Sequence, residues 1–300
     1  GSEMCIRDRL YSRPLSLATG FSSYLANIGK LQNKGYELEI RSTNIETKDF
    51  RWSTSLNLGH NANKILKLDG DLKQVTSGTS IHKVGLPYST YYMIEFAGID
   101  PVDGEPMFYK NTTDENGNLN KETTKDPRSA EKVIQQCADP TITGGLGNSI
   151  SYKWFDLGLT FTYSLGGYSF DKTGTLIETD GSKEKSYNLP VYALDRWQKP
   201  GDRTDVPRFV LEQGAGPQNS SRYIHSTDHI RLKNLTLGFT LPGRWVQKAL
   251  IENARVYFSG SNLLTWAKWK QYDPEVPVNG EVFCEAPPMR TFNFGVEITF

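Results

Sequence analysis

The last ten residues of this 300-residue chain read Thr291-Phe-Asn-Phe-Gly-Val-Glu-Ile-Thr-Phe300. Every second side chain from Phe292 to Phe300 is apolar, and the side chains between them are small or polar. Because successive side chains of a β-strand point to opposite faces, this pattern predicts a strand with one apolar face. About ten residues is also the length that a tilted strand needs to cross a bilayer. A soluble edge strand with so much bare apolar surface would invite aggregation, so the stretch favours the closing strand of an outer-membrane β-barrel.

The composition is compatible with this interpretation. Lys plus Arg and Asp plus Glu number 34 each, so no net charge points to a nucleic-acid partner. Mean hydropathy is −0.51 and no apolar run approaches the length of a membrane-spanning helix. A barrel is not excluded, because only every second residue of a barrel strand meets lipid. The 15 Tyr, 14 Phe and 6 Trp would supply the aromatic girdles of such a barrel.

The alternation recurs along the chain and predicts about nine strands. They cover residues 35–43, 50–59, 81–96, 105–109, 144–152, 155–165, 230–241, 256–260 and 291–300. The connections alternate between short turns (44–49, 98–104, 153–154 and 242–253) and long loops (61–79, 110–140, 167–227 and 266–288). Short periplasmic turns and long external loops are typical of outer-membrane barrels. The sequence therefore predicts an all-β, antiparallel transmembrane β-barrel.

Local irregularities give finer predictions. Ile230 and Leu232 have even numbers, whereas Leu235 and Leu237 have odd ones, so a β-bulge is expected at Lys233-Asn234. Residues 189–197 predict one or two helical turns, and 245–251 another short helical segment. Residues 10–34 read as a loop punctuated by Pro14, Gly20 and Gly29.

The amino terminus has a different character. Residues 1–9, Gly-Ser-Glu-Met-Cys-Ile-Arg-Asp-Arg, match neither a signal peptide nor a strand, and 4–8 resemble a translated sequencing adapter. We therefore expect 1–9 to be non-native and 10–300 to be the C-terminal part of a barrel. An odd strand count and two unpaired sheet edges favour an incomplete barrel, because bacterial barrels are even-stranded and hydrocarbon does not tolerate open edges.

Several motifs, taken in order, resemble the C-terminal barrel of SusC/RagA-type TonB-linked outer-membrane proteins. They are Asn27-Ile-Gly29, Asn33-Lys-Gly-Tyr-Glu-Leu38, Phe50-Arg-Trp52 with Asn57, Ala97-Gly-Ile-Asp-Pro101 with Asp103-Gly104, Gly144-Gly-Leu-Gly-Asn-Ser149, Tyr152-Lys-Trp-Phe-Asp-Leu157, Trp197 with Pro200-Gly-Asp202, Ile230-Arg-Leu-Lys-Asn-Leu-Thr-Leu-Gly238, Tyr257-Phe-Ser-Gly-Ser-Asn-Leu263 and Asp273-Pro-Glu275. The resemblance covers the chain from residue 27 to its end.

The resemblance implies a function and a set of partners. Such proteins are transporters of 22-strand size in the outer membrane of Gram-negative bacteria, and they import glycan or peptide nutrients with a SusD-like surface lipoprotein. An N-terminal plug and a segment that contacts the TonB complex are implied upstream of this chain. The barrel-assembly machinery and outer-membrane lipid are further implied partners. The resemblance implies neither a cofactor nor an enzyme activity.

Aromatic residues are the candidate site residues. We expect Phe300 to anchor at the periplasmic interface and to carry an assembly signal, with Phe292, Trp154 and Phe155 also in the interface girdles. Trp266, Trp269 and Tyr272 follow a strand end, where their rings could stack on a sugar or belong to the upper girdle. No Ser-His-Asp, Cys-His or paired-carboxylate arrangement indicates catalysis.

Other polar motifs leave alternatives open. His225 and His229 share a strand parity but would lie roughly 13 Å apart, too far to share a metal unless the backbone bends. Residues 114–120 place oxygen ligands at alternate positions, but Gly117 stands at position four of the loop instead of position six and no acid closes it at position twelve, so a polar turn is favoured over a calcium loop. Cys137 and Cys284 fall in predicted external loops, either as a disulfide or as two unpaired thiols.

Two other protein classes are compatible with parts of the pattern. A structural or adhesive outer-membrane barrel would use the long loops for binding and would transport nothing. A soluble β-sandwich or carbohydrate-binding module would have to bury every apolar strand face. A plug domain upstream would decide between the first class and a transporter, and a detergent requirement on extraction would exclude the second.

Overall fold

The computed structural model describes residues 2–6, 10–14, 20, 23–27, 29–68, 72–115, 117–178, 180–181, 188–211, 219–246, 251–275 and 280–300. Its main body is a tall sheet of eight strands in the order β1-β4-β5-β13-β14-β17-β18-β20, all paired antiparallel. The strands are β1 (Ser2–Ile6), β4 (Gly29–Glu46), β5 (Phe50–Leu68), β13 (Ile142–Tyr152), β14 (Phe155–Leu165), β17 (His229–Thr240), β18 (Asn253–Ala267) and β20 (Thr291–Thr299).

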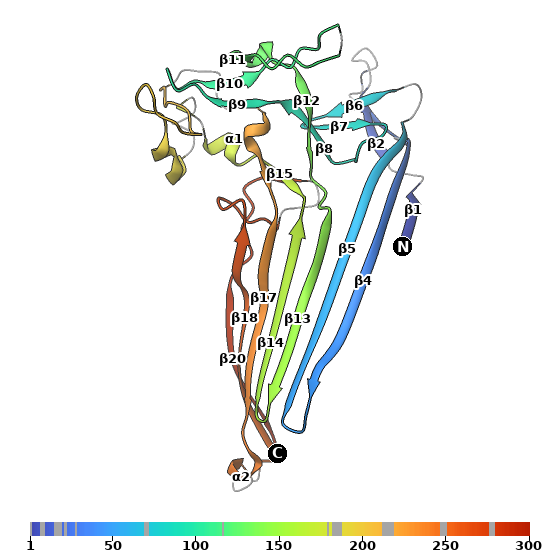
Figure 1. The fold of residues 1–300 in the computed structure, drawn as a ribbon, viewed down its shortest axis with the longest axis vertical. Helices are drawn as coiled ribbons and strands as arrows, with labels where there is room; N and C mark the ends of the chain where they lie inside the picture. Colours follow the sequence, from blue (N-terminus) through green and yellow to red (C-terminus); the bar gives the residue numbers. More distant parts are fainter. Residues whose placement is uncertain are drawn as a thin grey trace.

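The two ends of the tall sheet differ, as Figure 1 shows. At one end lie the C-terminus and short connections, namely 47–49, 153–154 and the segment that contains α2 (Gly243–Val246). We call this the short-turn end. At the other end, the long-loop end, the connections fold into small sheets. The asymmetry expected from connection lengths is therefore present, and the 153–154 turn and the strands around it are confirmed.

The long-loop end is built from short elements that form a body of their own. Its sheets have the orders β11-β10-β9, β12-β8-β7-β6, β16-β15-β19 and β2-β3. The strands are β2 (Leu10–Pro14), β3 (Ser23–Asn27), β6 (Gln74–Ser77), β7 (Ser80–Lys83), β8 (Thr90–Ile94), β9 (Phe96–Ile99), β10 (Pro106–Tyr109), β11 (Thr123–Thr124), β12 (Lys132–Cys137), β15 (Tyr168–Asp171), β16 (Ile224–Ser226) and β19 (Glu281–Val282). Short helices join them: η2 (Pro127–Ser129), α1 (Gly174–Ile177), η3 (Val191–Asp195) and η4 (Ser221–Tyr223).

Two predicted barrel strands belong to this body instead. Segments 81–96 and 105–109 divide among β7, β8, β9 and β10, and the 98–104 turn lies at the long-loop end. The prediction was wrong because these strands are too short to cross a bilayer. Their apolar side chains are also buried on both faces, as Tyr91, Met93 and Ile94 are, so they form a soluble core. The expected count of about nine tall strands gives way to eight.

The predicted strand boundaries were also wrong where the tall strands extend beyond the stretch in which apolar and polar side chains alternate. β5 extends to Leu68, into the first part of the predicted loop 61–79. β18 covers more than 256–260, and residues 10–34 contain β2, β3 and the start of β4. Polar residues continue these strands because backbone pairing needs no apolar alternation outside hydrocarbon. Residues 2–6 form β1 against β4, contrary to the prediction that 1–9 contain no strand, since an unpaired strand edge is a template for any neighbouring segment. Residues 1 and 7–9 lie outside the described part.

Other local predictions are confirmed. Lys233 is the extra residue of a bulge, because Asn234 pairs with Thr160 and Leu232 pairs with Phe161. The helical turns expected in 189–197 are η3. The segment expected at 245–251 is helical only at its start, where Trp245 and Val246 end α2, and 247–250 lie outside the described residues.

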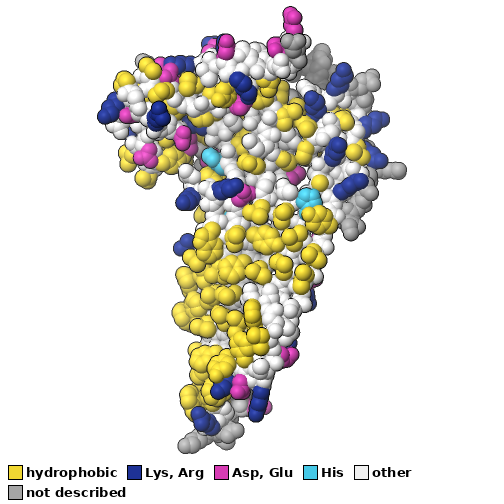
Figure 2. All heavy atoms as spheres, in the orientation of Figure 1, with side chains coloured by type: hydrophobic (Ala, Val, Ile, Leu, Met, Phe, Trp, Pro, Cys, Tyr) yellow, Lys and Arg dark blue, Asp and Glu magenta, His cyan; other side chains and the backbone are white. Residues whose placement is uncertain are grey.

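One face of the tall sheet is apolar. Phe294, Val296 and Ile298 of β20 are exposed, and Figure 2 shows hydrophobic side chains covering the tall sheet while charged ones gather above it and at its lower tip. None of the helices in the described part of the chain is long and apolar enough to cross a membrane.

The apolar face also carries a polar side chain, Asn148 of β13. Its Oδ1 accepts hydrogen bonds from Trp52 Nε1 at 3.0 Å and from Thr54 Oγ1 at 2.9 Å. A polar group in hydrocarbon must be satisfied within the protein, and the Oδ1 atom of Asn148 meets that requirement.

Candidate functional site

The opposite, polar face of the tall sheet is lined by small side chains. One row across it is set by strand register and consists of Arg41, Ser55, Gly147, Thr160, Asn234, Ser261 and Thr291. A depression of about 430 Å³ lies over β4, β5, β13 and β14 at this level. Because the Ser, Thr and Gly side chains in this row are short, they leave open space above the backbone of the sheet.

Two neighbouring strands are irregular at the same height. In β17, Lys233 is bulged relative to β14. In β18, Asn262 and Leu263 lie between Ser261 and Leu264, which pair with Asn234 and Leu232, and Asn262 has a left-handed φ of 55°. β-Bulges redirect side chains. At this pair of bulges the segment between β18 and β20 contacts the tall sheet.

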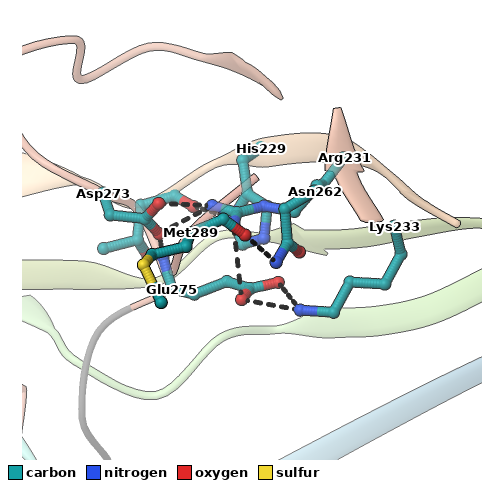
Figure 3. A network of polar contacts seen from close by, with 8 residues as sticks. His229, Arg231, Lys233, Asn262, Asp273, Glu275 and Met289 are labelled. Carbon is teal, nitrogen blue, oxygen red and sulfur yellow. Dashed lines mark hydrogen bonds and ion pairs between the residues drawn. The ribbon is translucent and has the colours of Figure 1, made fainter. Parts of the chain in front are cut away.

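An ion-pair network ties that segment to β17 (Figure 3). Arg231 Nη2 donates to both carboxylate oxygens of Asp273, at 2.6 and 2.7 Å. Glu275 bridges the two cations, with Oε2 3.0 Å from Lys233 Nζ and 3.5 Å from Arg231 Nη1. Arg231 is only 1% exposed, and these carboxylates compensate for the cost of burying its positive charge. On the bulge of β18, Asn262 Nδ2 donates to the carbonyl of Met289 at 3.1 Å.

The start of the same segment is fixed by aromatic stacking. Trp269 is 4% exposed and stacks on His225 at 4.7 Å between ring centroids and on Tyr272 at 5.7 Å. The Tyr272 hydroxyl donates to the carbonyl of Glu285. Burial lowers the pKa of His225 to about 4, so the imidazole under Trp269 is neutral at physiological pH. His229 does not join His225, because its Nδ1 lies 2.8 Å from the carbonyl oxygen of Thr227 and donates to it.

The body at the long-loop end has its own core and joints. Tyr91, Met93, Phe170 and Tyr223 form a buried cluster. Beside it, Arg222 contacts Asp180 at 2.9 Å and Glu178 at 3.0 Å. Burial raises the pKa of both carboxyl groups, and the charge of Arg222 opposes that rise.

A second joint brings together two motifs that are far apart in the sequence. Trp197 Nε1 donates to the Pro101 carbonyl at 3.1 Å, and the Trp197 ring covers Gly104, where any Cβ would collide with it. Gly104 also has a positive φ of 74°, so glycine is required there twice over. The joint connects the loop before β10 to the loop after η3.

The residues expected in girdles lie on the tall sheet as follows. Phe300 is 84% exposed at the short-turn end, where the exposed Phe155 ring lies 4.7 Å from Phe239 and Trp154 occupies the adjoining turn. Phe292 lies at the opposite end of β20, roughly 26 Å from Phe300 at 3.3 Å per residue. That separation is close to the roughly 25 Å height of the apolar band in outer-membrane barrels.

The three aromatic residues expected near a ligand do not form one surface. Trp266 is exposed at the end of β18, whereas Trp269 is buried in the stack with His225. Tyr272 is half-buried. A sugar could stack on Trp269 only by displacing His225 or Tyr272, so a role for it in ligand contact remains a prediction that this packing opposes.

The polar motifs left open by the sequence are local structures. Asp114 Oδ1 accepts from the backbone N–H of Asn118 at 2.7 Å, which makes a polar turn. Cys137 and Cys284 are both free thiols, and burial raises the pKa of Cys137 to about 11.

Near the short-turn end, the polar face carries a second charged group. Arg255 lies 2.7 Å from Asp156 and 3.6 Å from Glu297. Sequence reasoning selected none of the charged residues of either network as a site. A signal was present, because Arg231, Lys233, Asp273 and Glu275 all lie in motifs that carry the family resemblance, and Arg231 faces the polar side of a strand at a bulge.

Comparison with known proteins shows which proteins the chain resembles. No protein-family model matches the chain. TonB-dependent receptor P3 of Formosa agariphila is 32% identical over 318 residues, which cover 98% of this chain and 31% of the relative. TonB-dependent receptor SusC of Bacteroides thetaiotaomicron is 29% identical over 98% of the chain and 29% of the relative. A solved structure of the RagAB peptide transporter superposes with a TM-score of 0.85 at 29% identity, over 99% of this chain and 32% of that one.

Over nearly its whole length the chain matches TonB-dependent receptors of the SusC and RagA type. It spans about a third of the length of the relatives that it matches. The expected fold is confirmed, since the antiparallel sheet matches the RagAB barrel and its edges are not closed within this segment. SusC/RagA-type receptors are outer-membrane proteins. The proteins that this chain matches are named as receptors and transporters and not as enzymes.

Proposed function

We propose that the protein containing this chain imports glycan or peptide nutrients across the outer membrane of a Gram-negative bacterium. The observation that carries the proposal is the alignment of nearly the whole chain with both SusC and the RagAB peptide transporter. The two faces of the tall sheet support it physically. An apolar face suits lipid, and a face of small hydroxyl and glycine residues suits a solute pathway.

A SusD-type surface lipoprotein is the proposed partner at the long-loop end. That end carries strongly exposed apolar side chains on the body away from the apolar band, among them Val191 at 84% and Leu194 at 67%. A contiguous apolar patch exposed outside a membrane commonly marks a protein contact, and Leu189, Val191 and Leu194 lie close together in the chain. Residues 110–140, 167–227 and 266–288, as far as they are described, contribute to the surface proposed to meet this lipoprotein.

Other partners are proposed for other parts of the protein. The TonB complex would act through a segment outside this chain. The barrel-assembly machinery would read the C-terminal strand, which ends on the exposed Phe300, and outer-membrane lipid would cover the apolar face. We keep residues 1–9 as a proposed non-native segment and 10–300 as the barrel portion.

The test of import uses the full-length gene in its host. Deleting the gene should abolish uptake of one class of nutrient, either glycans or peptides, and deleting tonB should have the same effect. Complementation with the full-length gene should restore uptake. Normal growth on every glycan and peptide source after deletion, with surface adhesion lost instead, would favour the adhesive barrel.

The test of the partner is a pull-down of the full-length protein from native membranes. A SusD-type lipoprotein should be recovered with the wild type, and less of it with Val191→Asp combined with Leu194→Asp. Thr160→Ser on the polar face serves as a matched control. Recovery of the barrel without any such lipoprotein would contradict the proposed partnership.

A further inference from the structure

β4 and β5 continue past the apolar side chains toward the long-loop end, and their two faces differ there. Toward the body of small sheets, Leu31, Ile65 and Leu68 form a buried cluster. On the opposite face, which continues the apolar face of the tall sheet, the exposed apolar side chains of β4 end at Tyr36. The Tyr36 ring stacks on His60 of β5 at 4.9 Å between ring centroids. This pair marks the upper edge of the apolar face on these two strands.

Three exposed lysines lie beyond that edge on the same face, and we call Lys30, Lys64 and Lys67 the lysine cluster. Strand register sets Lys30 directly opposite Lys67, and Lys64 in the next row toward Tyr36. In Figure 2, Lys and Arg side chains gather beside the top of the apolar face, over the region where β4 and β5 continue upward in Figure 1. The cluster therefore borders the surface that faces lipid.

The positive charge of the cluster is not compensated within the structure. None of the three lysine side chains has an ion-pair or hydrogen-bond partner in the part of the chain that the structure describes. The acidic residues of β4 lie on the polar face, by register. Like charges directly opposite on paired strands are destabilising, so Lys30 and Lys67 repel each other across the sheet. An anionic group between them would replace that repulsion with two ion pairs.

The height of the cluster selects the kind of anion. Lys64 lies four residues beyond His60 in β5, and Lys67 lies seven. At 3.3 Å per residue in a strand tilted by about 40°, they stand roughly 10 Å and 18 Å above the Tyr36–His60 pair. The headgroup layer of a phospholipid leaflet is only about 5–8 Å deep. Lipopolysaccharide carries its phosphates and carboxylates on lipid A and on inner-core sugars, which extend farther from the hydrocarbon.

From this position and charge we propose that the lysine cluster binds the phosphate-bearing saccharide of lipopolysaccharide. The acyl chains of the same molecule cover Tyr36, Leu38 and the rest of the apolar face below, and its anionic groups lie between Lys30 and Lys67. Basic clusters that border a membrane-embedded surface recognise anionic headgroups in this way. The proposal rests on the proposed function only for orientation, namely that the long-loop end faces outside the cell.

The test is the binding of fluorescently labelled rough-type lipopolysaccharide to delipidated full-length protein in a non-ionic detergent. Replacing all three lysines of the cluster by glutamine should weaken binding about tenfold, because three exposed ion pairs of modest strength are lost. The matched control is Lys48→Gln combined with Lys132→Gln and Lys199→Gln, which removes the same charge from exposed lysines elsewhere. It should leave the affinity unchanged. Equal affinities of the parent and the cluster variant would overturn the proposal.

Two further probes identify the source of the anion. Dephosphorylated lipopolysaccharide should bind the parent more weakly than the intact molecule does. Phosphatidylglycerol should bind the parent and the cluster variant equally, because its headgroup lies below the lysines. A phosphatidylglycerol affinity that falls as far in the cluster variant as the lipopolysaccharide affinity would overturn the assignment to lipopolysaccharide.

Thermal unfolding in the same detergent separates a ligand site from a structural role. Without lipopolysaccharide, the cluster variant should unfold at the temperature of the parent or above it, because the repulsion between Lys30 and Lys67 is gone. Saturating lipopolysaccharide should raise the Tm of the parent more than that of the variant. A variant that unfolds earlier without lipopolysaccharide and gains as much from it would assign the lysines to the fold alone. If the triple variant does not fold, Lys67→Gln decides, with a smaller loss of affinity expected in the same direction.

None of these measurements depends on orientation in the membrane, so they test the site separately from the proposed function. Protease treatment of intact cells tests the orientation. If 167–227 were protected while 242–253 was cut, the orientation would be refuted, and lipopolysaccharide would be excluded as the ligand in the cell even if it binds in detergent.

Discussion

Arg231 of β17 holds both carboxylate oxygens of Asp273 through a single nitrogen, across 42 residues of sequence. The guanidinium is almost wholly buried, so the pair cannot be treated as a surface ion pair of small energetic value. The pair fixes where the connection between β18 and β20 crosses the tall sheet, and it thereby helps to set the shape of the long-loop end.

The first prediction concerns the strength of this pair. Asp273→Asn should lower the free energy of local opening of residues 268–275, measured by amide hydrogen exchange. Because Glu275 still lies 3.5 Å from Nη1, the loss should stay below the about 3–5 kcal/mol that accompanies a fully orphaned buried charge. Glu285→Gln is the matched control and should change nothing. No loss in the Asp273 variant would mean that Trp269 alone holds the segment.

The second prediction compares the two faces of β14. Leu159, half-way along the strand on the apolar face, pairs with Leu235, and Thr160 lies next to it on the polar face. Leu159→Arg should cost about 2–4 kcal/mol for unfolding in lipid, and Thr160→Arg much less. Phe239→Arg should cost about 0–1 kcal/mol, because Phe239 lies near the short-turn end beside Phe155. Equal costs at Leu159 and Thr160 would show that the faces are assigned incorrectly.

The sequence predicted the fold well only where the alternation of apolar and polar side chains reflects lipid on one face of a strand. Between Phe155 and Leu165, and in β20, lipid on one face and polar groups on the other impose a strict period of two, so these strands were predicted closely. The parity change between Leu232 and Leu235 likewise predicted the bulge. Beyond the apolar band that constraint ends, and the boundaries of β4, β5 and β18 could not be predicted.

The candidate site was less accessible to prediction. The pairing of Arg231 with Asp273 depends on how a long connection folds back, and no local pattern encodes that path. The same path buries Trp269, which the sequence left as an exposed ring near a strand end. Met93 and Tyr91 misled in another way, because a short strand buried on both faces resembles part of a membrane strand.

The third prediction concerns Phe300, the exposed terminal aromatic side chain. If the C-terminal strand is read by strand addition at an exposed edge, deleting Phe300 should reduce the membrane-inserted, heat-modifiable fraction of full-length protein. The free energy of unfolding of barrels that are already folded should fall by at most about 1.5–3 kcal/mol, which is the contribution of one buried apolar side chain. Phe292→Leu, at the other end of β20, is the control for a general loss of apolar surface. Unchanged insertion would leave Phe300 as an ordinary girdle residue.

The fourth prediction concerns pH. The folded protein holds His225 neutral down to a pKa of about 4, whereas an unfolded chain takes up the proton near 6.5. The stability contributed by the neutral ring is therefore complete above about pH 6.5 and is lost as the pH falls toward 4, at no more than about 1.4 kcal/mol per pH unit.

A comparison with His225→Phe isolates this effect. The raised pKa values of Glu178 and Asp180 act in the opposite direction, and they remain in both proteins. Phe keeps a ring against Trp269 but does not titrate. Amide exchange at residues 268–272 should become faster below pH 6.5 in the wild type relative to the variant. Parallel pH profiles for the two proteins would exclude His225 as the titrating group.

The orientation of the sheet in the outer membrane is the claim on which the others depend, and limited proteolysis of intact cells tests it most directly. Protease added to cells that express the full-length protein should cut within 167–227, where η3 and the exposed Val191 lie at the long-loop end. The turn at 153–154 and the segment 242–253 should be cut only after the outer membrane is permeabilised. Cleavage of intact cells confined to 242–253, with 167–227 protected, would contradict this orientation.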